Sequence, residues 1–383
     1  MPALNTESLI FSLLRSNRSF APSCGILHRR RCDRVANLAG MHRRLATRVL
    51  FVSIVSAALA AHAAPALTGN ELGLIINEAD PLSVLIGEYY AGKRRIPAQN
   101  ILRIRITNAG AILRAEEFAV LKADIDARTP KTVQAYALTW VTPDRVECMS
   151  ITSAFAFGFD RAYCAEGCAL TQGSPYFDSN SRQPYNELKL RPSMSIAATN
   201  VEDARALINR GVAASQRANS GRPPPGRAYL VETDDTARNV RAAGYAHAKL
   251  MVAGRVPVEI VHMPGLKDRD DVLFYFIGAR AVPDLTTNHF VAGAVGDHLT
   301  STGGNLLGFS FSQMSSLRWL EAGATGSFGT VVEPCNFSGK FPNVEILMRR
   351  YLDGETLIEA YWKSVAMPGQ GIFIGEPLAK VNR

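Results

Sequence analysis

The chain has 383 residues and a formal net charge of +8. Its first 63 residues carry nine arginines, two acids and no lysine, a net charge of +7, so residues 64–383 carry only 8 − 7 = +1. The basic character therefore belongs to the leader and gives no indication of a nucleic-acid partner. The other 383 − 63 = 320 residues are enough for one large domain or two small ones.

A secretory signal peptide is predicted over residues 41–63. MHRRLATR is a positive n-region, VLFVSIVSAALAA (49–61) is an apolar h-region, and AHA (61–63) is a small-residue cleavage site. The alternative is a membrane anchor, but the apolar run of 13 residues is short for a permanent span. We expect a protein exported to the periplasm or the cell exterior, without a transmembrane segment after cleavage, and residues 1–40 as a misassigned upstream stretch.

Strands and helices alternate in the first part of the expected mature chain. Helices are predicted over 80–97, where Asp80 can cap the first turn and Pro81 can begin it, and over 114–128. Apolar or alternating runs predict the strands, at 71–80, 101–106 and 132–143. Such alternation implies right-handed crossovers and a parallel sheet.

The pattern breaks between about residues 144 and 199. This segment holds three cysteines and many Ser, Pro, Asn and Tyr residues, and it has no helical period. We predict an inserted excursion of hairpins, clamped by a disulfide, over the carboxyl edge of the sheet.

The alternation then resumes. Asn200 caps a predicted helix over 200–218, and a helix over 343–365 is broken near Gly354. Further helices are predicted at 235–254 and 312–324, with strands at 228–233, 256–263, 272–278, 294–302 and 329–334 and a last extended piece at 371–381. The predicted fold is a single α/β domain over residues 64–383, with a mainly parallel sheet of about six to seven strands flanked by helices.

Four cysteines lie in the expected mature chain, and an even number in an exported protein favours disulfides. We expect Cys335 to form a disulfide, with Cys148 as the partner because both follow a strand end; the alternative is a buried free thiol. Cys164 and Cys168 are expected to close a small loop, since no histidine flanks them to suggest a metal site. No metal and no cofactor is predicted.

Open parallel sheets bind ligands at the carboxyl ends of their strands. Those ends are polar here, in the stretches NEAD, TPDR, ETDD, GAR, DHLTST and EPCN. The candidate ligand-contacting residues are Asp80, Asp144, Asp234, Arg280 and Asn336.

Two resemblances follow from longer stretches. GEYYAGKRRIP, QMSSLRWLEAGATGSFGTVVEPCNFSGKFPN, GETLIEAYWKSV and IGEPLAKV together resemble an uncharacterised family of exported bacterial proteins that brings no assigned activity. LEAGATGSFGT, YLDGETLIEAYWKSV and IGEPLAKV also resemble the closing segment of gingipain-type, caspase-like cysteine peptidases. The second resemblance implies a caspase/gingipain-like fold.

The peptidase resemblance also implies where a catalytic dyad would stand. Such peptidases place a histidine in a Gly-His-Gly turn after one strand and a cysteine at the tip of the next. Ala279 occupies the histidine position here, and Ser301 or Thr302 occupies the cysteine position. Both members of the dyad are therefore missing.

Two functions remain open. The first is a non-catalytic binding protein that recognises a peptide, a glycan or an envelope protein. The second is a hydrolase that has rebuilt its site from Cys335, His298 and Glu333, or from Ser301. A nucleophile needs a base within hydrogen-bond reach, so the positions of these side chains separate the two.

Overall fold

The computed structural model describes residues 66–107, 110–165, 167–308 and 313–382. The predicted signal peptide therefore lies outside the described residues. Within them, no helix combines the length and apolarity that a membrane span requires.

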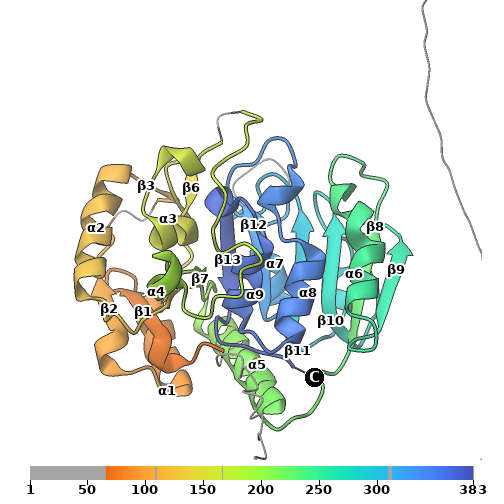
Figure 1. Cartoon of the computed structure of the whole chain (residues 1–383), viewed down its shortest axis with the longest axis horizontal. Coiled ribbons are helices and arrows are strands. Elements are labelled where there is room, and N and C mark those ends of the chain that lie inside the picture. Colours follow the sequence, from red (N-terminus) through yellow and green to blue (C-terminus); the bar gives the residue numbers. More distant parts are fainter. Residues whose placement is uncertain (1–65, 108–109, 166, 309–312, 383) are drawn as a thin grey trace, which may run out of the picture. The chain divides into compact units, whose positions relative to one another are not determined.

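A ten-stranded sheet forms the centre of the domain, in the order β2-β1-β4-β7-β13-β12-β11-β10-β8-β9 (Figure 1). Neighbouring strands run parallel, except that β12 and β13 are antiparallel. The predicted mainly parallel α/β sheet is confirmed, but it is larger than the six to seven strands expected. Its strands are β1 (Leu72–Asn77), β2 (Ile101–Ile104), β4 (Ala135–Leu138), β7 (Ser193–Ser195), β8 (Arg227–Glu232), β9 (Val258–His262), β10 (Val272–Gly278), β11 (Phe290–Leu299), β12 (Gly326–Thr330) and β13 (Gly371–Gly375).

Helices flank the sheet. Helices α1 and α5 contact each other, while α6, α8 and α9 form a second contiguous group. The α-helices are α1 (Pro81–Arg94), α2 (Ala115–Arg128), α3 (Ile151–Phe157), α4 (Pro184–Leu188), α5 (Val201–Asn219), α6 (Tyr245–Met251), α7 (Leu317–Glu321), α8 (Val344–Leu352) and α9 (Leu357–Ser364).

Local sequence accounts for several helix ends. The Asp80 carboxylate accepts a hydrogen bond from the Leu82 N–H at 2.9 Å, which makes Asp80 the N-cap of α1 as predicted. Asn200 caps α5 in the same way, through the Asp203 N–H. Gly354 has a φ of +82° between α8 and α9, where the predicted break falls.

Two helices are shorter than predicted. The stretch 235–254 contains the 3₁₀ helix η4 (Asn239–Gly244) followed by α6, in place of one continuous helix. Among the described residues 313–324, α7 is the one helix, and Gly323 follows it with a φ of +114°. Both α-helices therefore begin later than predicted.

The segment 144–199 is more regular than predicted. It contains a short antiparallel pair, β5 (Arg145–Val146) with β6 (Met149–Ser150), which joins β3 (Ile112–Leu113) in a small second sheet. It also contains α3 and α4, although no helical period was recognised there. Its last residues form β7 within the main sheet, so the excursion ends before residue 193.

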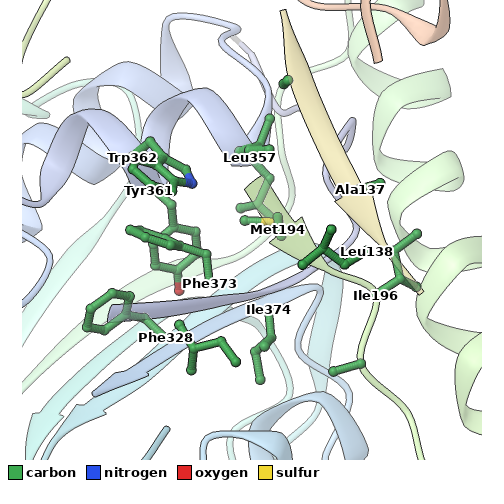
Figure 2. Close-up of a cluster of buried hydrophobic side chains, with 14 of the residues drawn as sticks. Ala137, Leu138, Met194, Ile196, Phe328, Leu357, Tyr361, Trp362, Phe373 and Ile374 are labelled. Atoms are coloured by element: carbon green, nitrogen blue, oxygen red, sulfur yellow. The ribbon is translucent and has the colours of Figure 1, made fainter. Parts of the chain in front are cut away.

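The core lies between α9 and the middle of the sheet (Figure 2). Trp362 of α9 stacks on Phe373 of β13 with ring centroids 4.5 Å apart, and Phe373 meets Phe328 of β12 edge to face at 5.1 Å. Met194 of β7 and Leu138 of β4 continue this apolar layer. The contacts fix β13 between the two groups of strands and so fix the strand ends that carry the candidate site.

Candidate functional site

The segments that follow β11 and β12 lie side by side. The Ser301 carbonyl accepts hydrogen bonds from the Glu333 N–H at 3.0 Å and from the Thr330 hydroxyl at 3.1 Å. A Cβ at Gly304 would stand 2.7 Å from the Thr330 carbonyl carbon, so only glycine allows this approach. The structure thus brings together Ser301, Glu333, Cys335 and Asn336 near the end of β11, where His298 lies.

His298 is buried and has partners on both ring nitrogens. Trp319 Nε1–H donates to His298 Nδ1 at 3.0 Å, so the proton of the neutral ring lies on Nε2, which donates to the Met314 carbonyl at 3.0 Å. Burial lowers the pKa of His298 to about 4, with Arg241 and Arg238 acting in the same direction. Neither nitrogen is left to accept a proton from a nucleophile.

Glu333 is buried in a turn that it holds together. Its Oε2 accepts the backbone N–H groups of Cys335, at 2.8 Å, and of Asn336. Its Oε1 lies 3.2 Å from Lys340 Nζ, and both side chains are fully buried. Glu333 therefore neutralises a buried cation and supports the backbone, and it does not orient His298.

All four cysteines of the described region form disulfides, which confirms the expected disulfide bonding. The expected pairing is wrong: Cys148 bonds to Cys164, and Cys168 bonds to Cys335. The small loop therefore lies within the excursion, whereas the second bond joins the excursion to the segment after β12. Cys335 has no thiolate to offer as a nucleophile while this bond is intact.

Ser301 is half-buried, and in the part of the chain that the structure describes no hydrogen bond joins its hydroxyl to a histidine or a carboxylate. The neighbouring Thr300 hydroxyl accepts from Arg238 Nε at 3.1 Å and donates to Gln313 Oε1 at 2.8 Å. Ala279, which follows β10 directly, has only a methyl group. The arrangement around Ser301 supplies cation and amide contacts rather than a base.

The candidate ligand-contacting residues are divided in space. Asp234 and Asn336 lie with the segments after β8 and β12, where exposed Asp234 is 3.0 Å from His262 Nε2 and Asn336 Nδ2 donates to the Ala237 carbonyl at 2.7 Å. Arg280 follows β10, and its carbonyl accepts from the Met314 N–H. Asp144 joins this edge through its Oδ2, which accepts from the Leu306 N–H at 3.3 Å.

Asp80 does not share this site. Asp80 caps α1, the helix that follows β1. Strand β1 lies five positions from β11 in the strand order. At about 4.8 Å between neighbouring strands, five positions amount to roughly 24 Å. Its role in the structure is to cap a helix.

A cavity of about 420 Å³ opens beside the segment that follows β12. The walls come from η4 and α6, from the segment 338–345 that begins α8, from Ser364 and Ala366, and from Phe177 of the excursion. The disulfide Cys168–Cys335 and the hydrogen bond from Lys340 Nζ to the Ala169 carbonyl, at 2.9 Å, join the excursion to the segment after β12. This is a volume typical of small-molecule sites.

The sequence indicates only part of the lining of this cavity. The stretch FDSN (177–180) resembles a sugar- or peptide-contacting loop, although ordinary loop packing is the alternative, whereas Arg241 and Asn343 fall within predicted helices. Their gathering depends on the contact between α6 and α8, which are about one hundred residues apart along the chain. The one available signal was Asn343 in front of an apolar helix, the pattern of an N-cap.

No group of three or more His, Cys, Asp or Glu side chains with metal-binding geometry occurs among the described residues. The structure therefore gives no position at which to place a metal ion within the described ranges.

No protein-family model and no curated protein sequence matches the chain. Among solved structures, the chain is similar to the Arg-specific cysteine proteinase gingipain R (RGPB), with a TM-score of 0.43 and 10% identity over 83% of this chain and 80% of that one. It is also similar to a protein described as a protease (TM-score 0.39, 8% identity, 82% and 79% covered). A complex of the Porphyromonas gingivalis RgpB pro- and mature domains gives a TM-score of 0.39 at 9% identity, with 82% and 80% covered. These similarities concern the path of the chain, and no residue's role follows from them.

Proposed function

We propose that this chain is an exported, non-catalytic binding protein that holds a peptide, a glycan or an envelope protein where the segments after β8 and β12 meet. The observation that carries the proposal is that the candidate thiol nucleophile and the candidate base are both engaged within the protein. Cys335 is bonded to Cys168, and both nitrogens of His298 have hydrogen-bond partners. Nucleophilic catalysis requires a free nucleophile with a base in reach.

Buried pairs at this edge support a structural role for its charges. The Glu333–Lys340 pair is fully enclosed, and Arg241 lies 2.6 Å from Asp297 with both side chains nearly inaccessible. Removing one partner of such a pair leaves an uncompensated buried charge, so these residues are suited to holding a shape. A rigid edge beside a preformed cavity is what a binding site requires.

Reactive probes test the proposal against hydrolase activity. The unreduced protein is treated with a serine-reactive fluorophosphonate and a thiol-alkylating probe, in parallel with the Ser301→Ala variant and with Ser220→Ala as an exposed serine control. We expect no labelling of the folded protein above that of the denatured protein. Labelling that Ser301→Ala abolishes and Ser220→Ala retains would overturn the non-catalytic proposal in favour of a hydrolase.

A further inference from the structure

A second cavity, of about 630 Å³, lies at the other end of α8 from the cavity of 420 Å³. Its walls come from the segment 180–183, from Glu187 of α4, and from Arg350, Asp353 and Glu355 at the end of α8 and in the connection to α9. Every one of these described lining residues is polar or charged. Ligand cavities are usually lined mainly by apolar side chains, so this lining favours a ligand that is polar over most of its surface.

Buried charges form the floor of this cavity, and they are already paired. Arg350, with its side chain only 10% exposed, has Nη2 2.7 Å from Asp178 Oδ1 and Nη1 3.4 Å from Glu355 Oε1. Arg182 reaches Glu355 at 3.5 Å and Glu359 at 3.4 Å, and both of these carboxylates are almost completely buried. A charged ligand that broke one of these pairs would leave a buried charge uncompensated. The floor therefore favours a neutral ligand.

Two exposed amides on the rim are held through their oxygens. Asn180 Oδ1 accepts from Arg350 Nη1 at 2.9 Å. Gln183 Oε1 accepts from Asn186 Nδ2 at 2.8 Å. The NH₂ groups of Asn180 and Gln183, and the carboxylate of Glu187, have no partner among the residues that the structure describes. The rim thus offers two hydrogen-bond donors and one acceptor at the same cavity.

Hydroxyl groups match this rim, because each hydroxyl can both donate and accept hydrogen bonds. We propose that this cavity binds a neutral polyhydroxylated ligand such as a sugar. Its hydroxyls accept hydrogen bonds from Asn180 Nδ2 and Gln183 Nε2 and donate to the Glu187 carboxylate. The inference goes beyond the proposed function, since this cavity is separate from the place where the segments after β8 and β12 meet.

A smaller cavity, of about 270 Å³, adjoins the first, because Arg182 and Gln183 line both. The segment 66–68, Thr132 and Gln134 supply other parts of its wall. An oligosaccharide can therefore extend from one cavity into the other past Gln183. For this reason the test uses trisaccharides.

Titration calorimetry of the full, unreduced protein tests the class of ligand. The neutral ligands are maltotriose, cellotriose, tri-N-acetylchitotriose and sorbitol, and the charged ligands are sodium glucuronate and spermidine. We expect at least one neutral ligand to bind at millimolar concentration, and at least tenfold more tightly than either charged one. A trisaccharide as the tightest ligand identifies a sugar site, and sorbitol as the tightest identifies a site for a linear polyol.

A matched pair of double variants tests the location. Gln183→Ala/Glu187→Ala removes one free donor and the free acceptor, whereas Gln172→Ala/Glu88→Ala makes the same changes at exposed residues outside the cavity. The loss of two hydrogen bonds lowers affinity about tenfold, which we expect for the first variant, with less than a twofold change for the second. In the parent protein, the side-chain amide ¹H–¹⁵N signals of Asn180 and Gln183 should shift on binding, which locates the ligand without any substitution.

Four results would overturn the inference: no binding of any neutral ligand, tighter binding of glucuronate or spermidine than of every neutral ligand, unchanged affinity in Gln183→Ala/Glu187→Ala, or unshifted amide signals. None of these results alters the probe-labelling test of the proposed function.

Discussion

Asp144 is a carboxylic acid buried between the excursion and the loop after β11. Burial raises its pKa to about 6 from 3.8, against the smaller opposing effect of the Leu306 N–H. The folded protein therefore holds this proton more tightly than the unfolded chain, so the contribution to stability is complete below about pH 4 and is lost as the pH rises through 6.

The Asp144→Asn variant isolates this contribution. Two pKa units correspond to about 3 kcal/mol of unfolding free energy, which the parent protein should lose relative to the variant between pH 4 and pH 7. Urea unfolding at several pH values measures the difference, and Asp124→Asn on exposed α2 serves as the control. A variant whose pH profile matches that of the parent would contradict the burial of the Asp144 carboxyl group as the cause.

His298 titrates in the opposite sense. Because its pKa is lowered to about 4, the neutral ring is favoured by folding, and its contribution to stability is present above pH 6.5 and lost as the pH falls toward 4. The ¹⁵N NMR spectrum between pH 5 and pH 7 should show a neutral imidazole with its proton on Nε2, unchanged over this range. A Trp319→Phe variant removes the donor to Nδ1 and should release the tautomer preference. A protonated ring at pH 6 would exclude the arrangement described here.

At the scale of elements, the two disulfides differ in the length of chain that they close. Cys148 and Cys164 are 16 residues apart, whereas Cys168 and Cys335 are 167 residues apart. In the chain-entropy model, removing the first bond costs about 3 kcal/mol and removing the second about 5 kcal/mol. Urea unfolding of the Cys148→Ser/Cys164→Ser and Cys168→Ser/Cys335→Ser double variants should show the larger loss in the second. A larger loss in the first would mean that local packing, and not loop length, sets the cost.

Elements with strong local signals could be predicted from the sequence. Asp80 and Pro81 indicate the beginning of α1, and Gly354 indicates the break between α8 and α9. Strand β10 is a buried apolar run of seven residues, and β8 and β11 each contain a shorter apolar stretch that can be recognised.

The elements that were missed depend on tertiary contacts. Strand β7 has only three residues, and it is defined by its neighbours β4 and β13 rather than by a pattern of its own. Helix α3 is short and begins after Ser150, whose hydroxyl caps it while also donating to the Gly371 carbonyl, 221 residues away. Cysteine pairing likewise follows from which segments meet in space, and sequence spacing does not contain that information.

Parallel topology predicts which strand ends lie together, but it does not predict the state of the side chains there. The polar strand ends do gather after β11 and β12, as parallel topology requires. The tautomer of His298 could not be predicted, because its donor Trp319 lies 21 residues further along the chain. The burial of Lys340 could not be predicted either, because lysine side chains are usually exposed.

For the whole molecule, the disulfides and the sequence of the leader lead to one prediction about export. Oxidised cysteines are typical of compartments outside the cytoplasm. Amino-terminal sequencing of the protein from a periplasmic or culture fraction should find a chain that begins after Ala63. An intact Met1 or Met41 on cytoplasmic material would contradict export with cleavage.

Strand β13 is the last of the ten strands along the chain, yet it lies in the sheet between β7 and β12. Two groups of strands, β2-β1-β4-β7 and β12-β11-β10-β8-β9, are therefore synthesised before the strand that joins them. Until residues 371–375 arrive, β7 and β12 are both open edges, and open edges invite pairing with other chains. The order of synthesis thus completes the middle of the sheet last. During synthesis, the strand edges of β7 and β12 at the centre of the sheet are the ones that need protection from pairing with other chains.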